Sequence, residues 1–199
     1  MDYNSIYNYY NDQLQKILTP ARYTHSMRVV QTSLKLAPKF DADYQKTALA
    51  ALVHDRGKEI GVNQLIKIAE QAGLILDEAE TSHPGLLHGP VGAYLLKQEG
   101  KINDEDILQA VRFHTTGRPG MSSIEKAVFL ADLIEPGRDY PNVDILRKLS
   151  FNEPYLGLVK ALDWTLEYLM RMGWVIHPLT VKTRNYYLQK RGTTRSLKI

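Results

Sequence analysis

Apolar residues recur at three- and four-residue intervals along most of this chain, and this spacing restricts it to a helical fold. Strand signals are nearly missing, because no Asn-Gly or Asp-Gly turn separates two runs of alternating apolar residues. We therefore predict an all-α fold, a bundle of helices that cross at different angles. The predicted helices, in chain order, run from Tyr23 to a stop near Pro38, from Ala48 to His54-Asp55, from Leu65 to near Gly73, from His88 to Gly100, from Asp104 to before Thr116, from Ser122 to Pro136, from about Pro154 to Met172, and from near Pro178 onward.

The length and composition of the chain are those of an ordinary globular domain. It has 199 residues, of which 44% are hydrophobic and 24% are charged, so it is not a disordered chain. No repeat or linker interrupts it, and we expect a single domain over residues 1–199. The longest aliphatic stretch, Ala48–Val53, is far shorter than the roughly 20 residues of a membrane span. The first residues lack the features of a signal peptide, so the expected location is the cytoplasm.

The absence of cysteine limits the chemistry that this chain can carry. It excludes a disulfide scaffold, an iron–sulfur cluster, a thiolate zinc site and a cysteine nucleophile. Any metal ion would have to be held by imidazole and carboxylate groups, and the chain has six histidines. The histidines are therefore the first candidates for function.

Several histidines and aspartates fall at positions where a polar side chain needs a partner. Asp132 follows Val128 and Phe129 on the apolar face of its helix, where an ionised carboxylate is costly unless it is paired, hydrogen-bonded or bound to a metal ion. A salt bridge or a helix cap is the alternative for this residue, and a single histidine on an apolar face is more often a core residue than a ligand. If several helix ends converged at one point, four histidines and two aspartates would nevertheless come together there as one metal-binding set. These six residues are His25, His54, Asp55, His88, His114 and Asp132.

The order of His25, His54-Asp55 and Asp132 resembles the H…HD…D signature of the HD-domain metal-dependent phosphohydrolases. The surrounding segments resemble the YqeK family, HD-domain hydrolases that cleave diadenosine tetraphosphate symmetrically to two ADP. The segments are RYTHSMRV at 22–29, ALVHDRGK at 51–58, LLHGPVGAYL at 86–95 and RFHTTGRPGMSSIEKAVFLADLIEPGR at 112–138. The resemblance extends from about Tyr10 to Tyr186. It implies the same activity, and an HD-domain helical bundle with extra C-terminal helices.

The resemblance also implies a dinuclear metal centre, with iron as the expected metal and manganese, zinc or magnesium as alternatives. One ion would be held by His25, His54, Asp55 and Asp132. The second would be held by His88 and His114, with Asp55 as the bridge. Where the family usually has an aromatic and a small residue after the aspartate, this chain has Arg56-Gly57, which leaves the ligands intact and changes the loop around them. His83 and His177 have no counterpart among the family's ligands, and we interpret both as structural or surface residues.

Metal ions of this kind would serve phosphoryl chemistry. Two divalent cations about 3.5–4 Å apart can lower the pKa of a water they share, so that hydroxide attacks phosphorus, and can clamp the phosphoryl oxygens. Asp55 and Lys58 are the predicted catalytic residues, and an ordinary solvent-facing lysine is the alternative for Lys58. The predicted substrate-binding residues are Arg22, Lys58, Thr115, Gly117 and Arg138. ADP leaves as a weakly basic phosphate, so no strong general acid is required.

The expected partner is therefore a dinucleoside polyphosphate, with ADP as product, and a homodimer is a further expectation. An HD-type nucleotide phosphatase and a non-catalytic nucleotide-binding regulatory protein are the alternatives. A third alternative is an RNA-associated module, because no acidic residue follows Glu167. The basic residues after it are Lys182, Arg184, Lys190, Arg191, Arg195 and Lys198. No zinc knuckle or aromatic RNA-binding motif accompanies them, so the sequence favours neither nucleic acid nor a membrane as a partner.

Overall fold

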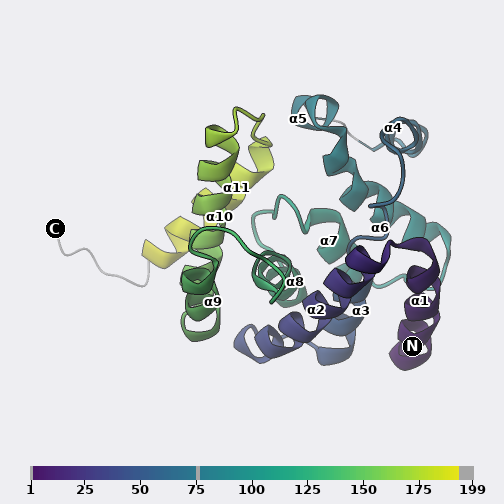
Figure 1. Cartoon of the computed structure of the whole chain (residues 1–199), viewed down its shortest axis with the longest axis horizontal. Coiled ribbons are helices and arrows are strands. Elements are labelled where there is room, and N and C mark those ends of the chain that lie inside the picture. The colour runs from purple at the N-terminus through teal and green to yellow at the C-terminus, as the bar shows by residue number, and fades with distance from the viewer. Residues whose placement is uncertain (1, 75–76, 193–199) are drawn as a thin grey trace.

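The computed structural model describes residues 2–74 and 77–192, and these ranges hold eleven α-helices, two 3-10 turns and no strand (Figure 1). The helices are α1 (Tyr3–Ile17), α2 (Pro20–Leu36), α3 (Tyr44–Val53), α4 (Val62–Gln71), α5 (Glu78–Ser82), α6 (His88–Gln98), α7 (Glu105–Phe113), α8 (Ser123–Ile134), α9 (Val143–Asn152), α10 (Pro154–Arg171) and α11 (Pro178–Gly192). The 3-10 turns are η1 (Ala37–Lys39) and η2 (Pro84–Leu87). The predicted all-α fold is confirmed. No helix within the described ranges is long and apolar enough to cross a membrane.

Every helix expected from the sequence is present, and two of the predicted start signals act as caps. The Asp104 side chain accepts a hydrogen bond from the amide of Asp106, and Ser122 forms a capping box with Glu125 at the start of α8. Helices α1, α5 and α9 were not expected individually. The reason is visible in α1, which is rich in tyrosine and asparagine and buries only Tyr10 and Leu14, so its apolar stripe is thin.

Four helices form the centre of the bundle. Helices α2, α3, α7 and α8 pack against one another, α1 covers α3, and α6 covers α7. The main core lies between them and includes the fully buried Leu49, Leu52, Ile107 and Leu130. A smaller apolar cluster lies under α4, where Leu65 meets Leu87. Helices α9, α10 and α11 form a separate group beside α8, as expected for extra C-terminal helices (Figure 1).

Glycine allows α6 to approach its neighbours closely at the backbone. A Cβ atom on Gly89 would lie 2.8 Å from the carbonyl oxygen of Arg112 in α7. On the other side of α6, a Cβ atom on Gly57 would collide with the carbonyl oxygen of His88. Because neither side chain exists, the first turn of α6 fits between the loop after α3 and the end of α7. This contact determines where His88, the first residue of α6, lies.

Candidate metal centre

The structure brings the six predicted ligands together where helix ends converge. His25 lies on α2, and His54 and Asp55 directly follow α3. His88 begins α6, His114 directly follows α7, and Asp132 lies in the last turn of α8. Their ligand atoms form overlapping groups of three within 4.8 Å of one another: His25, His54 and Asp55; His54, His114 and Asp132; and Asp55, His88 and His114. The cluster is therefore built from five helices that are far apart in sequence.

Three of the histidines are oriented in the same way. His54, His88 and His114 each donate a hydrogen bond from Nδ1 to the carbonyl oxygen three residues earlier. The acceptors are Ala51, Gly85 and Val111, at Nδ1–O distances of 2.7, 2.5 and 2.7 Å. A neutral imidazole that donates from Nδ1 carries its lone pair on Nε2. All three Nε2 lone pairs therefore face the cluster, in the arrangement typical of metal-binding histidines.

The distances between these donor atoms fit a shared cation. The Nε2 atoms of His88 and His114 lie 2.9 Å apart, and with both ring protons on Nδ1 no hydrogen lies between them. The Nε2 atom of His54 is buried and has no hydrogen-bond partner among the described residues. Facing lone pairs and a buried unpaired nitrogen are unfavourable unless a cation accepts them. Ligand atoms bound to one ion at about 2.0–2.1 Å lie roughly 3.0–3.4 Å apart, close to the spacing seen here.

Asp55 lies between two groups of histidines. Its Oδ1 atom is 3.3 Å from Nε2 of His88 and 3.6 Å from Nε2 of His114. Its Oδ2 atom is 3.7 Å from Nε2 of His54. The two carboxylate oxygens thus face different imidazoles, Oδ1 those of His88 and His114 and Oδ2 that of His54.

Glu135 is a residue of the site that the sequence reasoning missed. His25 contacts Oδ1 of Asp132 through Nε2 at 3.0 Å, and its Nδ1 atom lies 3.2 Å from Oε1 of Glu135. Glu135 is buried, and its other oxygen accepts a hydrogen bond from the amide of Gly137. A carboxylate on the far nitrogen of an imidazole fixes its orientation and increases its basicity as a ligand. The signal was present in the ADLIEPGR segment, where an acidic residue ends an otherwise buried helix.

Burial and mutual contacts give these groups the charges that a metal site needs. Burial lowers the pKa of His54 to about 4 and also lowers the pKa of His88, so both imidazoles are neutral near neutral pH. Burial disfavours the charged forms of Asp55 and Asp132 as well. For Asp132 the hydrogen bond with His25 outweighs this effect and holds the carboxyl pKa well below its usual range. Neutral imidazoles and ionised carboxylates are the protonation states that bind a divalent cation.

Two of the predicted phosphate-binding side chains lie at the edge of this cluster. The Nζ atom of Lys58 is 3.4 Å from Nε2 of His88. Arg138 donates from Nη2 to Oδ1 of Asp132 and from Nε to the backbone carbonyl of the same residue, at 2.7 Å for the second bond. Arg22 lies farther out, where it donates to the carbonyl of Lys58 at 2.6 Å and forms an ion pair with Glu59 at 3.3 Å. Its charge is already partly compensated.

The loop after His114 contains two predicted substrate-binding residues, Thr115 and Gly117, and they differ in how accessible they are. Thr115 is half-buried and lines a pocket, whereas Gly117 is buried, with a φ of +63°. A Cβ atom on Gly117 would lie 2.8 Å from the side chain of Thr183 in α11, so glycine is required for packing as well as for conformation. The amide of Gly117 already donates to the carbonyl of Phe113 at 2.8 Å. The phosphate contact that we predict for this amide would have to compete with that bond.

The remaining sequence features lie outside the ligand cluster. The ring of His83 contacts the ring of Trp174 at 5.2 Å, and Nδ1 of His177 accepts a hydrogen bond from the amide of Leu179. Arg56 forms an ion pair with Glu99 at 3.0 Å. The Arg56-Gly57 pair therefore contributes a surface ion pair and a close backbone contact to α6, and it leaves the neighbouring ligands in place.

Replacing Gly89 by alanine should separate α6 from α7, because the new methyl group would press on the Arg112 carbonyl. We expect a loss of stability of about 1–3 kcal/mol, measured by urea denaturation. We also expect weaker metal binding at His88 and His114, measured by metal content. Gly61→Ala is the matched control, because a Cβ atom there meets no atom within 4 Å. Equal stability and metal content in the two variants would contradict this account of α6.

Comparisons with known proteins agree with this geometry. A family model described as the HD domain matches residues 22–137. A Bacillus subtilis protein named "Bis(5'-nucleosyl)-tetraphosphatase, symmetrical" is 40% identical over 172 residues, which cover 85% of this chain and 90% of that protein. A Staphylococcus aureus protein of the same name is 37% identical, with 85% and 88% covered. A crystal structure from Clostridium acetobutylicum, described as a "predicted HD superfamily hydrolase involved in NAD metabolism", matches with a TM-score of 0.88 and 38% identity, over 92% of this chain and 97% of that one.

Proposed function

This chain belongs to the HD-domain family, and we propose on that basis that it is a symmetrical bis(5'-nucleosyl)-tetraphosphatase, which cleaves diadenosine tetraphosphate to two ADP. Members of this family bind divalent metal ions, and the six clustered side chains are the donors that this chain offers. The observation that carries the proposal is the set of Nε2 lone pairs from His54, His88 and His114 that converge on Asp55. A cluster of this composition suits a cation and has no evident structural use without one.

Two ions of this kind supply an activated water and positive charge for the phosphoryl oxygens. Four side chains would hold the first ion: His25, His54, Asp55 and Asp132. His88, His114 and Asp55 would hold the second. Iron is the expected metal and manganese, zinc and magnesium are the alternatives, because imidazole and carboxylate ligands accept several divalent ions.

The remaining residues bind and orient the substrate. Lys58 places an ammonium group beside His88, where it can bind a non-bridging phosphate oxygen as negative charge develops. Arg138 holds Asp132 in place, and its guanidinium is 39% exposed, so its free N–H groups can also contact a phosphate. Arg22 would have to exchange Glu59 for a phosphate. The carboxylic acids of the cluster are ionised and serve as ligands, which agrees with a leaving ADP that needs no strong acid.

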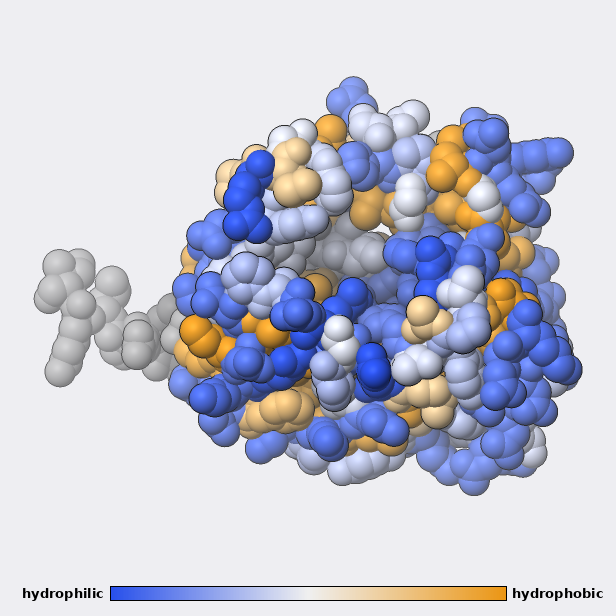
Figure 2. All heavy atoms as spheres, viewed as in Figure 1, coloured by the Kyte–Doolittle hydropathy of each residue, from blue (hydrophilic) through white to orange (hydrophobic). Residues whose placement is uncertain are grey.

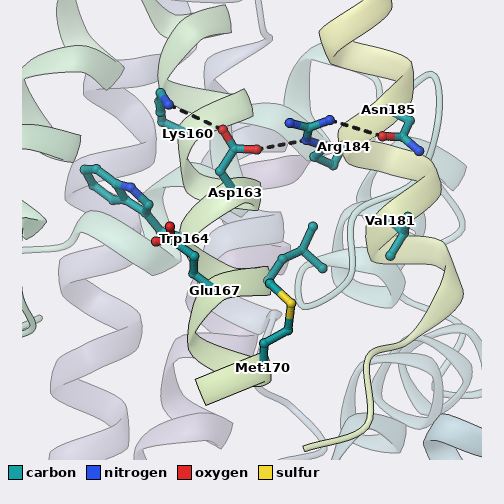
Figure 3. A pocket seen from close by; sticks show the side chains of 9 residues that line it. Lys160, Asp163, Trp164, Glu167, Met170, Val181, Arg184 and Asn185 are labelled. Carbon is teal, nitrogen blue, oxygen red and sulfur yellow. Dashed lines mark hydrogen bonds and ion pairs between the residues drawn. The ribbon is translucent and has the colours of Figure 1, made fainter. Parts of the chain in front are cut away.

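The alternative functions have less support. An HD-type nucleotide phosphatase would use the same ligands, and a regulatory protein without activity would not need all six of them. The RNA alternative depends on basic residues near the C-terminus, but Arg184 donates to Asp163 at 2.8 Å, and Lys160 also contacts this carboxylate (Figure 3). Arg195 and Lys198 lie outside the described residues. The single domain over residues 1–199, the homodimer and the cytoplasmic location stay predictions.

The direct test is product analysis with purified, metal-loaded protein. Diadenosine tetraphosphate should give ADP as the single nucleotide product, resolved by chromatography. Unchanged substrate, or AMP with ATP, would contradict the proposal, and phosphate released from ADP would favour the phosphatase. Elemental analysis of protein purified without added metal should find about two equivalents of iron. A different metal would change the cofactor assignment and not the reaction.

Replacing Arg138 by lysine should lower kcat/KM by about 10–100-fold, a range typical for residues that orient metal ligands. Lysine keeps the charge but cannot make the two bonds that hold Asp132 from its backbone and side chain. Steady-state kinetics at fixed metal concentration would measure the effect. Arg171→Lys, at an exposed position at the end of α10, is the control. An unchanged kcat/KM in the Arg138 variant would show that the guanidinium is not needed.

A further inference from the structure

The segment Glu135–Arg138 follows α8 and contacts two proposed ligands of the first ion site. Oε1 of Glu135 lies 3.2 Å from Nδ1 of His25, and Arg138 donates a hydrogen bond to the carboxylate of Asp132. A polar partner of this kind fixes the orientation of a metal ligand. The position of this segment therefore determines how His25 and Asp132 are presented to an ion.

The end of α8 is held mainly by side chains that come after it in the chain. A helix leaves its last four carbonyl groups without a partner inside the helix. In α8 all four accept a hydrogen bond, and three of the donors are side chains. The carbonyl of Ala131 accepts from the amide of Glu135 at 2.9 Å, that of Asp132 from Nε of Arg138 at 2.7 Å, that of Leu133 from the hydroxyl of Tyr140 at 2.8 Å, and that of Ile134 from Nε of Arg147 at 2.9 Å. The position of the helix end therefore depends on these side chains.

Arg147 of α9 makes more of these contacts than the other side chains do. Besides the bond to Ile134, its Nη2 atom donates to the carbonyls of Glu135 and Arg138, at 2.9 and 2.7 Å. Its Nη1 atom forms an ion pair with Asp144 at 2.7 Å. A guanidinium is planar and its donors have fixed directions. One rigid group thus joins the last carbonyl of α8 to both ends of the segment Glu135–Arg138.

The side chain of Glu135 can move only with its own backbone. Oε1 faces His25, and Oε2 accepts a hydrogen bond from the amide of Gly137. The side chain is 4% exposed. A Cβ atom on Gly137 would collide with Nη1 of Arg28 and lie 3.0 Å from both carboxylate oxygens, so the loop is packed closely around them. A displacement of the backbone that Arg147 holds would therefore be transmitted to His25.

We infer that Arg147 is a positioning residue of the metal centre, which fixes His25 and Asp132 by holding the segment Glu135–Arg138 from α9. In the part of the chain that the structure describes, its side chain bonds to this segment, to Ile134 and to Asp144, and to none of the six proposed ligands. Figure 2 shows the surface hollowed between α11 and the α5–α6 segment, and α9 lies apart from this hollow (Figure 1). The inference rests on the proposed function, but metal binding tests it without the substrate.

Arg147→Lys tests the inference through the affinity for Mn²⁺. Lysine keeps the charge, but its single ammonium nitrogen cannot span the three carbonyl groups that the guanidinium joins. We expect Kd for the ion at the first site to rise about 10–100-fold. The second ion should bind as in the wild type, because its ligands His88 and His114 are oriented by the carbonyls of other segments. Calorimetric titration of chelator-treated protein with Mn²⁺ would measure both constants.

Two further variants connect the effect to His25. His25→Ala removes a ligand of the first ion and so identifies which of the two binding events belongs to it. Glu135→Gln should weaken the same event. The double variant of Arg147→Lys and Glu135→Gln should lose less affinity than the product of the two single losses, because both changes act on His25. In each variant kcat/KM for diadenosine tetraphosphate should fall together with this affinity.

Arg184→Lys is the matched control. Arg184 is also partly buried and donates to a carboxylate, that of Asp163 at 2.8 Å, but it connects α11 to α10. Asp144→Asn is a second control, because Asp144 is 83% exposed and its loss leaves the three carbonyl bonds of Arg147 in place. Both variants should bind the two Mn²⁺ ions as the wild type does.

The pattern of the two affinities decides the result. Equal weakening of both ions in a folded Arg147 variant would overturn the inference, and so would unchanged binding of the ion that His25 holds. If the lysine variant does not fold, Arg147→Gln takes its place, because its amide can still donate to one carbonyl. A wild-type protein that binds both ions but leaves diadenosine tetraphosphate intact would refute the proposed function, and the Mn²⁺ affinities would still test the role of Arg147.

Discussion

Asp55→Ala should abolish the hydrolysis of diadenosine tetraphosphate and lower the metal content of the protein. Asp55 presents one oxygen to His54 and the other to His88 and His114, so its loss removes a ligand from both proposed ion sites. The other proposed ligands cannot compensate for the loss of Asp55, because the same ions would both activate water and stabilise the charge on the phosphoryl oxygens. We expect kcat to fall by on the order of a thousandfold or more. Steady-state kinetics and elemental analysis of the same preparation would measure both effects.

His83→Ala is the control for this experiment. His83 contacts Trp174 and lies outside the ligand cluster, so its removal should change neither turnover nor metal content. Asp55→Asn adds a second comparison, since it keeps the size of the side chain but removes its charge. Activity near the wild-type level in either Asp55 variant would overturn the assignment of the bridging ligand.

Removal of the metal ions should eliminate activity and also destabilise the protein. Without ions, the Nε2 atoms of His88 and His114 face each other at 2.9 Å, and Nε2 of His54 has no hydrogen-bond partner in residues 2–74 and 77–192. A ligand present at a thousand times its dissociation constant stabilises a folded protein by about 4 kcal/mol. For a chain of this length this corresponds to a fall in Tm of roughly 8–16 °C. Thermal unfolding before and after treatment with a chelator would measure it, and added metal should restore both Tm and activity.

The Asp55→Ala variant also serves as the control for metal removal. A chelator should change its Tm little, because its metal sites are already impaired. A wild-type protein that keeps its Tm and activity after complete removal of metal, verified by elemental analysis, would contradict the assignment of the cluster as a metal centre.

The sequence predicted the central fold well where side-chain patterns are local. The capping box of Ser122 and Glu125 and the cap by Asp104 depend on residues a few positions apart, and both form as expected. Helix α1 was missed because its contacts with α3 are made by only a few buried residues, Tyr10 and Leu14 among them. A helix that buries so few apolar residues is stabilised mainly by packing against its neighbour, so the sequence pattern alone does not predict it.

In the candidate site too, the sequence predicted what local patterns determine and missed what depends on contacts between helices. The six candidate ligands were predicted from their residue types, their positions at helix ends and their surrounding segments, and the structure places them in one cluster. Glu135 was missed because its role depends on contact with His25 from another helix. His177 directly precedes α11, and its Nε2 atom lies 3.9 Å from Oε1 of Glu80 in α5, a proximity that no local pattern encodes. Gly117 was predicted to bind phosphate through its amide. In the structure this amide donates a hydrogen bond to the carbonyl of Phe113, a contact that the sequence pattern did not reveal.

The origin of the ligands on five separate helices affects how the metal centre can be assembled. His25 on α2 and Asp132 on α8 contact each other, so the first proposed ion site is incomplete in any part of the chain that ends before α8. During synthesis, the residues proposed for the second ion, Asp55, His88 and His114, are all present once α7 has emerged, whereas the first proposed site also needs α8 packed onto α2. Occupancy of both proposed sites would therefore require that α2, α3, α6, α7 and α8 have packed together.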